Sequence, residues 1–140
     1  MNDDSGAKDS SLRILLDTNA FLWAVQQPEE LEDAAREAIE DPSTEVYVSS
    51  AAAWEISIKY SKGHLPLPLA PLVYITARMK ALGFQDLPIT RDHALATGLL
   101  PAIHADPFDR VMIAQAQVED LTLVTRDARV LAYPVKTLPA

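Results

Sequence analysis

A chain of 140 residues that is 49% hydrophobic and 23% charged has the size and composition of one globular domain with a sizeable core. It contains no cysteine, which excludes disulfides, thiolate zinc sites and cysteine nucleophiles, and no apolar run approaches the roughly 20 residues of a membrane span. Its net charge of −8 argues against a broad basic surface for nucleic acid and suits a basic peptide or protein as partner.

Residues 1–11 are polar and lack the apolar core of a secretory signal, so we interpret them as a disordered tail or a cloning remnant and expect a cytoplasmic protein. Residues 12–140 then form one domain in which strand and helix patterns alternate. The strand patterns cover 13–16, 45–49, 84–89 and 121–124, with a last edge strand near Val135. The helix patterns cover 19–26, 31–39, 50–62, 70–82, 92–100, a long helix that starts at Asp106, and 128–132. This alternation predicts an α/β fold, a three-layer α/β/α sandwich with a mostly parallel sheet.

Capping residues, glycines and prolines set the ends of these elements. Ser50 and Thr90 are suitable helix N-caps, and Gly63 and Gly83 are suitable helix ends. The proline-spaced segment 65–69 is expected to be an extended connector.

Acidic residues recur at four places along this pattern. Asp17 and Asp127 each follow a buried strand, Asp106 and Asp109 begin the long helix, and Glu55 lies in a helix among apolar neighbours that favour a cleft over solvent. In open α/β sheets, ligands bind beyond the carboxyl ends of the strands. Several carboxylates gathered there repel one another unless a cation lies between them, and oxygen ligands suit Mg²⁺ or Mn²⁺. The pattern therefore indicates metal-assisted phosphodiester chemistry.

Each of these acids also has a structural explanation. Asp17 can cap the following helix, Glu55 can be a solvated side chain, and Asp127 can be a turn residue. Asp106 and Asp109 frame a strong helix start, with an N-cap, a proline at the first position and an acid in the first turn. Only one of the two need face the cleft, and Asp109 has the better-fixed position.

Basic side chains and histidines carry weaker signals. Arg110 can pair with a carboxylate or reach a phosphate, and the structural role is favoured. Lys59 and Lys62 are phosphate contacts or part of a solvated surface. The spacing of the three histidines, at positions 64, 93 and 104, suggests no zinc site.

Four motifs stand in a fixed order along the chain. They are Leu15-Leu16-Asp17-Thr18-Asn19, Trp54-Glu55-Ile56, Asp106-Pro107-Phe108-Asp109-Arg110 with Ile113-Ala114-Gln115-Ala116, and Leu123-Val124-Thr125-Arg126-Asp127. Each motif alone is weak, whereas all four in this order are specific, and they span about 12–135. Together they resemble the PIN domain and, within it, the VapC toxins of bacterial and archaeal toxin–antitoxin systems.

The resemblance implies a small α/β/α fold and a Mg²⁺- or Mn²⁺-dependent endoribonuclease that hydrolyses RNA phosphodiester bonds. It also implies a homodimer and a cognate VapB-type antitoxin that lays a C-terminal segment across the active site; no membrane is expected to take part. By matching motifs, the acidic set carries over to Asp17, Glu55, Asp109 and Asp127, with Asp106 left open as a fifth. We expect Asp17 and Asp109 to be the principal metal ligands and Asp127 to complete the site. Glu55 is expected to bind a second ion or to orient the attacking water.

Two other functions stay open at this point. A phosphoacceptor receiver domain is also a small α/β fold with an acidic pocket, and Lys136 has the place of its late lysine. Against it, Asp17 stands alone where a receiver carries adjacent acids, and Asp86 is a poor phosphoacceptor. The second alternative is a PIN-like binding module without catalysis, and the complete acidic set argues against it.

Overall fold

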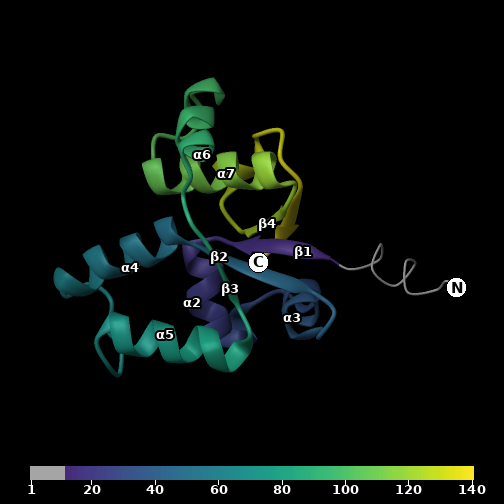
Figure 1. Ribbon diagram of the computed structural model, residues 1–140. Helices are drawn as coiled ribbons and strands as arrows, with labels where there is room; N and C mark the ends of the chain where they lie inside the picture. The colour runs from purple at the N-terminus through teal and green to yellow at the C-terminus, as the bar shows by residue number, and fades with distance from the viewer. Residues whose placement is uncertain (1–11) are drawn as a thin grey trace, which may run out of the picture.

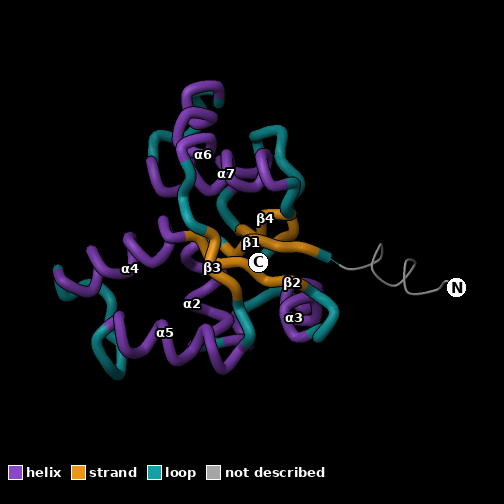
Figure 2. Tube along the Cα trace, in the orientation of Figure 1, coloured by secondary structure: helices purple, strands orange, loops and turns teal. Residues whose placement is uncertain are grey.

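The computed structural model describes residues 12–140, so the expectation for residues 1–11 lies outside the described residues. Within this range, five parallel strands form one sheet in the order β3-β2-β1-β4-β5. Helices cover both of its faces, which confirms the predicted three-layer α/β/α fold (Figure 1 and Figure 2). The strands are β1 (Arg13–Leu16), β2 (Glu45–Ser49), β3 (Gln85–Leu87), β4 (Thr122–Thr125) and β5 (Thr137–Pro139).

The helices divide between the two faces of the sheet. Figure 1 shows α6 and α7 on one side and α2, α3 and α5 on the other, while α4 contacts α2, α5 and α7. Among the helices of residues 12–140, none combines the length and the apolar character that a membrane span needs. The helices are α2 (Thr18–Gln26), α3 (Asp33–Glu40), α4 (Ser50–Ser61), α5 (Pro71–Leu82), α6 (Arg91–Ala96), α7 (Pro107–Glu119) and α8 (Ala128–Leu131), with 3₁₀ turns η1 (Pro28–Glu30) and η2 (Thr97–Leu99).

The centre of the core is β1 together with α7. Ile14, Leu15 and Leu16 are fully buried because β1 lies between β2 and β4 and has helices on both faces. Five consecutive residues of α7, 112–116, are also buried, because this helix packs against both β4 and α6. The first turn of α7 is thereby held firmly beside the carboxyl end of the sheet.

Most helix boundaries differ from the sequence predictions by a residue or more, and two of these differences have a clear local cause. Ser49, rather than Ser50, caps α4, because the Ser49 hydroxyl accepts the first free backbone N–H while Ser50 is already helical. Helix α6 ends at Ala96, and Gly98, a weak helix former, follows within η2. The expected end at Gly83 is confirmed: it closes α5 with a φ of 72°, a conformation that suits glycine.

The predicted last edge strand is present, but its position was wrong: it lies at Thr137–Pro139, two residues beyond Val135. Val135 lies in a tight turn, where its backbone N–H donates to the Tyr133 carbonyl at 2.8 Å. The chain pairs with β4 only after this turn. Pro139 is tolerated there because β5 is an edge strand.

The strand order decides between two of the predicted functions. A receiver domain has the order 2-1-3-4-5, whereas this sheet has the order 3-2-1-4-5, so the receiver alternative is wrong. In this order, the direction of winding reverses between β1 and β4, and ligands of open α/β sheets bind at such a switch point. Asp17 follows β1 and Asp127 follows β4, so both acids lie at this crevice.

Candidate active site

Asp17 is the most buried acid of the site, with 8% of its surface exposed. It caps α2, because Oδ1 accepts a hydrogen bond from the Ala20 backbone N–H at 2.8 Å. Burial raises the pKa of Asp17, and hydrogen bonds from Ala20 and Thr125 offset this only in part. The negative charges of Glu55 and Asp127 raise the pKa further. Ionised Asp17 is therefore held at a cost in free energy that a nearby cation would relieve.

Glu55 reaches the site from α4 and is not a solvated side chain. Its Oε1 accepts a hydrogen bond from the Thr18 hydroxyl at 2.6 Å, and its Oε2 lies 2.9 Å from the Lys59 ammonium. The carboxylate thereby links α4 to the first residue of α2. Lys59 lines the same pocket, so it is part of the site. Lys62 is exposed at the end of the helix.

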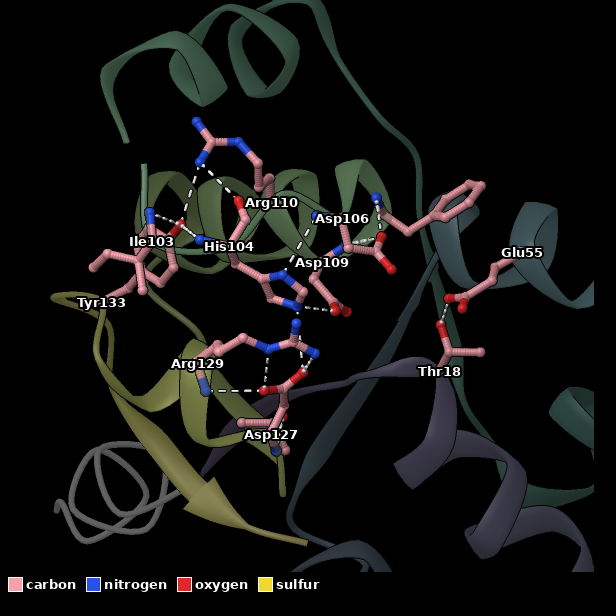
Figure 3. Close-up of polar contacts among 12 residues, drawn as sticks. Thr18, Glu55, Ile103, His104, Asp106, Asp109, Arg110, Asp127, Arg129 and Tyr133 are labelled. Atoms are coloured by element: carbon pink, nitrogen blue, oxygen red, sulfur yellow. Dashed lines mark hydrogen bonds and ion pairs between the residues drawn. The ribbon is translucent and has the colours of Figure 1, made fainter. Parts of the chain in front are cut away.

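Asp106 and Asp109 have different tasks at the start of α7. Asp106 is the N-cap, because its Oδ1 accepts from the backbone N–H groups of Phe108 at 2.8 Å and of Asp109 at 3.3 Å. Asp109 instead points its carboxylate at His104, with Oδ2 at 2.7 Å from Nε2 (Figure 3). Burial raises the pKa of Asp109 to about 6, with the charge of Asp106 adding to this and His104 opposing it.

Asp127 completes the acidic group from the segment after β4. Its Oδ1 accepts from the Arg129 backbone N–H at 2.9 Å, which caps α8. Its Oδ2 lies 3.3 Å from His104 Nε2 and 3.4 Å from the Arg129 guanidinium. Burial alone would raise the pKa of Asp127, but the hydrogen bonds and the charge of Arg129 outweigh it and lower the pKa.

Three of these acids, Asp17, Asp106 and Asp127, cap helices with one carboxylate oxygen. The structural and the functional explanations are thus compatible, because a capping carboxylate keeps oxygen lone pairs that its backbone partner does not use. Capping also fixes the direction of each side chain. The positive ends of the helix dipoles of α2 and α7 face the same crevice and favour negative charge there.

His104 belongs to the site, and sequence reasoning missed it. It lies in the loop before α7, is 5% exposed, and directs Nε2 at both Asp109 and Asp127 (Figure 3). One ligand atom from each of His104, Asp109 and Asp127 lies within 4.8 Å of the other two. Ligand spacing typical of zinc sites could not reveal it, because Asp127 comes from a different part of the fold. One feature of the sequence could have indicated His104: it lies two residues before the N-cap of the helix that carries Asp109.

The acids surround a pocket of about 390 Å³ at the carboxyl end of the sheet. Five carboxylates and three basic side chains line it, so negative charge is in excess. The lining residues are Asp17, Thr18, Asn19, Trp23, Glu55, Lys59, Asp106, Asp109, Arg126, Asp127 and Arg129. The pocket thus brings together all the acids that the sequence pointed to.

Two arginines have structural roles next to the pocket. Arg110 donates to the backbone carbonyls of Pro101, His104 and Thr97 at 3.0, 3.2 and 2.9 Å, as the favoured structural prediction requires. Arg126 stacks on the Trp23 ring with its guanidinium carbon 4.1 Å from the ring centroid. Arg110 therefore holds the loop before α7, and Arg126 fixes one wall of the pocket.

The side chains of the pocket fit a hard divalent cation. Asp17, Asp109 and Asp127 offer carboxylate oxygens, which are the ligands that Mg²⁺ and Mn²⁺ prefer. Burial raises the pKa of both Asp17 and Asp109, so a cation bound beside them would favour their ionised forms. The arrangement can therefore bind a cation and place it against a phosphate group.

Comparisons with known proteins agree with this geometry. Ribonuclease VapC16 of Mycobacterium tuberculosis is 35% identical over 83 residues, which are 55% of this chain and 57% of that protein. The chain therefore spans little more than half the length of this relative. The crystal structure of VapBC2 from Rickettsia felis, bound to a promoter DNA fragment, has a TM-score of 0.68 at 15% identity and covers 91% of this chain and 98% of the other.

A toxin–antitoxin complex from Klebsiella pneumoniae has a TM-score of 0.61 at 22% identity, with 90% of this chain and 96% of the other covered. At these identities, the two structures establish likeness of fold. The family model described as PIN domain matches residues 14–136, which is most of the chain. The protein therefore belongs to the PIN domain family.

Proposed function

We propose that the protein is a divalent-metal-dependent endoribonuclease, the toxin of a type II toxin–antitoxin system. One observation carries this proposal: Asp17, Asp109 and Asp127 come from three different segments and line one pocket at the switch point of the sheet. Burial raises the pKa of Asp17 and Asp109 there, so a bound cation would stabilise their ionised forms. The likeness to Ribonuclease VapC16 supports RNA as the substrate.

Asp17 and Asp109 are proposed as the principal ligands of Mg²⁺ or Mn²⁺, with Asp127 completing the set. The bound cation would neutralise phosphate charge and make a water molecule a better nucleophile. Glu55 lies across the pocket, held by Thr18 and Lys59, and can orient that water or bind a second ion. Lys59 and Arg129 add positive charge at the rim of the pocket, where an RNA backbone would approach.

A VapB-type antitoxin and a second copy of the chain are the proposed protein partners. The excess of carboxylates in the pocket suits a basic segment, because one arginine could bond several carboxylates at the position of the cation. Solved structures of the same fold include complexes titled VapBC and toxin–antitoxin, which supports such a partner.

The test is incubation of the pure protein with structured RNAs in Mn²⁺ or Mg²⁺, followed by gel analysis of the products. We expect cleavage that chelation abolishes, and we expect no cleavage by Asp17→Asn, which keeps the shape of the side chain but not its charge. The matched control is Asp92→Asn, which changes an exposed acid in the first turn of α6 and should cleave like the unaltered protein.

Full activity of Asp17→Asn would refute the metal site. Failure of the unaltered protein to cleave RNA at every Mg²⁺ and Mn²⁺ concentration would instead favour the PIN-like binding module.

A further inference from the structure

The ring of His104 has one tautomer that fits its neighbours. Nδ1 lies 3.3 Å from the Asp106 backbone nitrogen, which has a hydrogen to donate, so Nδ1 must be the acceptor. The ring proton is then on Nε2, and this N–H points at Oδ2 of Asp109 at 2.7 Å and at Oδ2 of Asp127 at 3.3 Å. The ring therefore donates between two carboxylates that come from different elements.

The backbone of His104 is fixed from outside the pocket. Its N–H donates to the Tyr133 hydroxyl at 2.8 Å, and its carbonyl accepts from Arg110 at 3.2 Å. The same hydroxyl accepts from the Ile103 N–H and donates to the Pro101 carbonyl at 2.9 Å. Figure 3 shows Tyr133 and Arg110 on the side of the loop away from the ring's acidic partners. This anchoring keeps the ring from following the carboxylates if they move apart.

The two carboxylates need such a link. Asp109 lies in α7, and Asp127 lies in the segment after β4. One oxygen of each carboxylate lies within 4.8 Å of the other, and like charges this close repel each other. A shared N–H donor lowers the repulsion and fixes which oxygens remain turned toward the pocket. Partners that orient metal-ligating side chains in this way typically contribute a factor of about 10–100 to metal affinity.

We propose that His104 is a positioning residue that holds Asp109 and Asp127 together as one divalent-cation site. The inference rests on the proposed function, since it concerns the same acids. His104 acts through its Nε2–H bond to the carboxylates and not as a nitrogen ligand. A nitrogen ligand would require the other tautomer, which gives up the bond from the Asp106 N–H.

Two substitutions separate the functions of the two ring nitrogens. In His104→Gln, the amide nitrogen lies as many bonds from the main chain as Nε2, so a donor toward the carboxylates is kept. In His104→Asn, the amide oxygen takes the place of Nδ1 and accepts from Asp106, while the donor toward the carboxylates is lost. His93→Asn is the matched control, because buried His93 also accepts a backbone N–H at Nδ1 and places Nε2 2.7 Å from a carboxylate, that of Glu119.

The experiment measures Mn²⁺ binding to the RNA-free protein by calorimetry, together with thermal unfolding and the Mn²⁺ concentration that gives half-maximal RNA cleavage. We expect His104→Asn to weaken Mn²⁺ binding by about 10–100-fold. His104→Gln should recover most of this loss, and His93→Asn should bind Mn²⁺ as the unaltered protein does. Two-bond ¹H–¹⁵N correlation spectra should show His104 protonated at Nε2 in the metal-free protein.

The outcomes that overturn the inference are distinct. Unchanged Mn²⁺ affinity in His104→Asn removes the positioning role, and an equally large loss in His104→Gln makes the ring a direct ligand. If His104→Asn fails to fold, His104→Gln and the ring spectra still decide, because protonation at Nδ1 contradicts the assigned bonds. If the unaltered protein binds no Mn²⁺ and cleaves no RNA, the proposed function fails and this inference fails with it. If it does both and only the His104 effects are missing, the inference fails alone.

Discussion

The two ends of α7 contain the same hydrogen-bond unit in different surroundings. At each end, a buried histidine accepts a backbone N–H at Nδ1 and places Nε2 at 2.7 Å from a carboxylate: His104 with Asp109 at the start, and His93 with Glu119 at the end. Glu119 is 40% exposed in its side chain and is held in this way by His93. Asp109 is 20% exposed and lies beside Asp106, Asp127 and Asp17.

The difference between the two ends lies in water and in neighbouring charge. At the end of α7, solvent stabilises the carboxylate, so the unit serves to fasten α6 to α7. At the start of α7, burial and the charge of Asp106 raise the pKa of Asp109 to about 6, so the ionised state is held under electrostatic strain. The same local geometry is thus structural where the acid is solvated, and it is suited to binding a cation where the acids are crowded.

The largest expected contrast is in activity. Asp109→Asn should reduce RNA cleavage in Mn²⁺ below detection, because it removes a charged ligand from the proposed metal site. Glu119→Gln keeps an acceptor for His93 and should cleave like the unaltered protein. Initial rates at saturating Mn²⁺ measure both variants. Equal losses in the two variants would show that the two ends of α7 do not differ in function.

A second contrast is in stability, and its sign follows from the pKa of Asp109. The folded-state pKa of about 6 exceeds the ordinary value of 3.8, so this group contributes stability that is complete below pH 3.8 and is lost as the pH rises through about 6. An amide does not ionise, so Asp109→Asn avoids this loss of stability at high pH. In the metal-free protein, it should therefore raise the free energy of unfolding at pH 7 by about 1–3 kcal/mol.

Urea titrations in chelator at pH 3.5 and pH 7 measure this effect. The gain should be absent at the lower pH, and Glu119→Gln should show no gain at either. A stabilisation of Asp109→Asn that is equal at both pH values would contradict the electrostatic explanation.

A third contrast concerns two helix N-caps, one near each of the two histidines. Asp106 caps α7 beside the pocket, and Thr90 caps α6 beside His93. Replacing either by Ala should lower the free energy of unfolding by about 0.5–2 kcal/mol, because a backbone N–H loses its acceptor. Denaturation measures the loss, and cleavage by Asp106→Ala should persist once the variant is folded. If Asp106→Ala instead loses cleavage while Asp109→Ala keeps it, Asp106 is the ligand and the assignment at the helix start is reversed.

The smallest expected effect is on a basic partner. If an arginine of the antitoxin occupies the cation position, Mn²⁺ should weaken the toxin–antitoxin complex a few-fold more than NaCl of equal ionic strength. Binding measured by calorimetry in the two salts tests this, and Asp17→Asn should reduce the difference. Identical effects of the two salts would mean that the antitoxin acts away from the acids.

The fold and the acidic residues were predictable because their signals are local. The buried run 14–16 and the start of α7 each carry a pattern within a few residues, and the structure places both as expected. The sequence also pointed to Asp17, Glu55, Asp109 and Asp127, which line one pocket, while their chemical roles remain predictions. Asp106 was left open as a fifth ligand, and its capping bonds do not decide its role, because Asp17 and Asp127 cap helices in the same way.

The parts that sequence reasoning missed depend on contacts between distant segments. His104 becomes informative only once Tyr133, 29 residues later, binds its backbone and Asp127 approaches its ring. Thr18 likewise meets Glu55 across 37 residues. The last strand was misplaced because the turn at Val135 is set by a hydrogen bond to Tyr133 and not by residue preference. The repeat of apolar residues along a helix or strand gives no information about such contacts between distant segments.

The position of β4 also restricts when the proposed activity can arise. This strand lies next to β1 in the sheet, although more than a hundred residues separate Leu16 from Val124, its partner in the register. A chain still emerging from the ribosome has made Asp17 and Glu55 long before β4 exists, and parallel pairing of distant strands forms late and cooperatively. The acidic pocket is assembled only when synthesis has passed Asp127. Until then, a nascent chain that already carries Asp17 and Glu55 lacks a complete site for the proposed RNA cleavage.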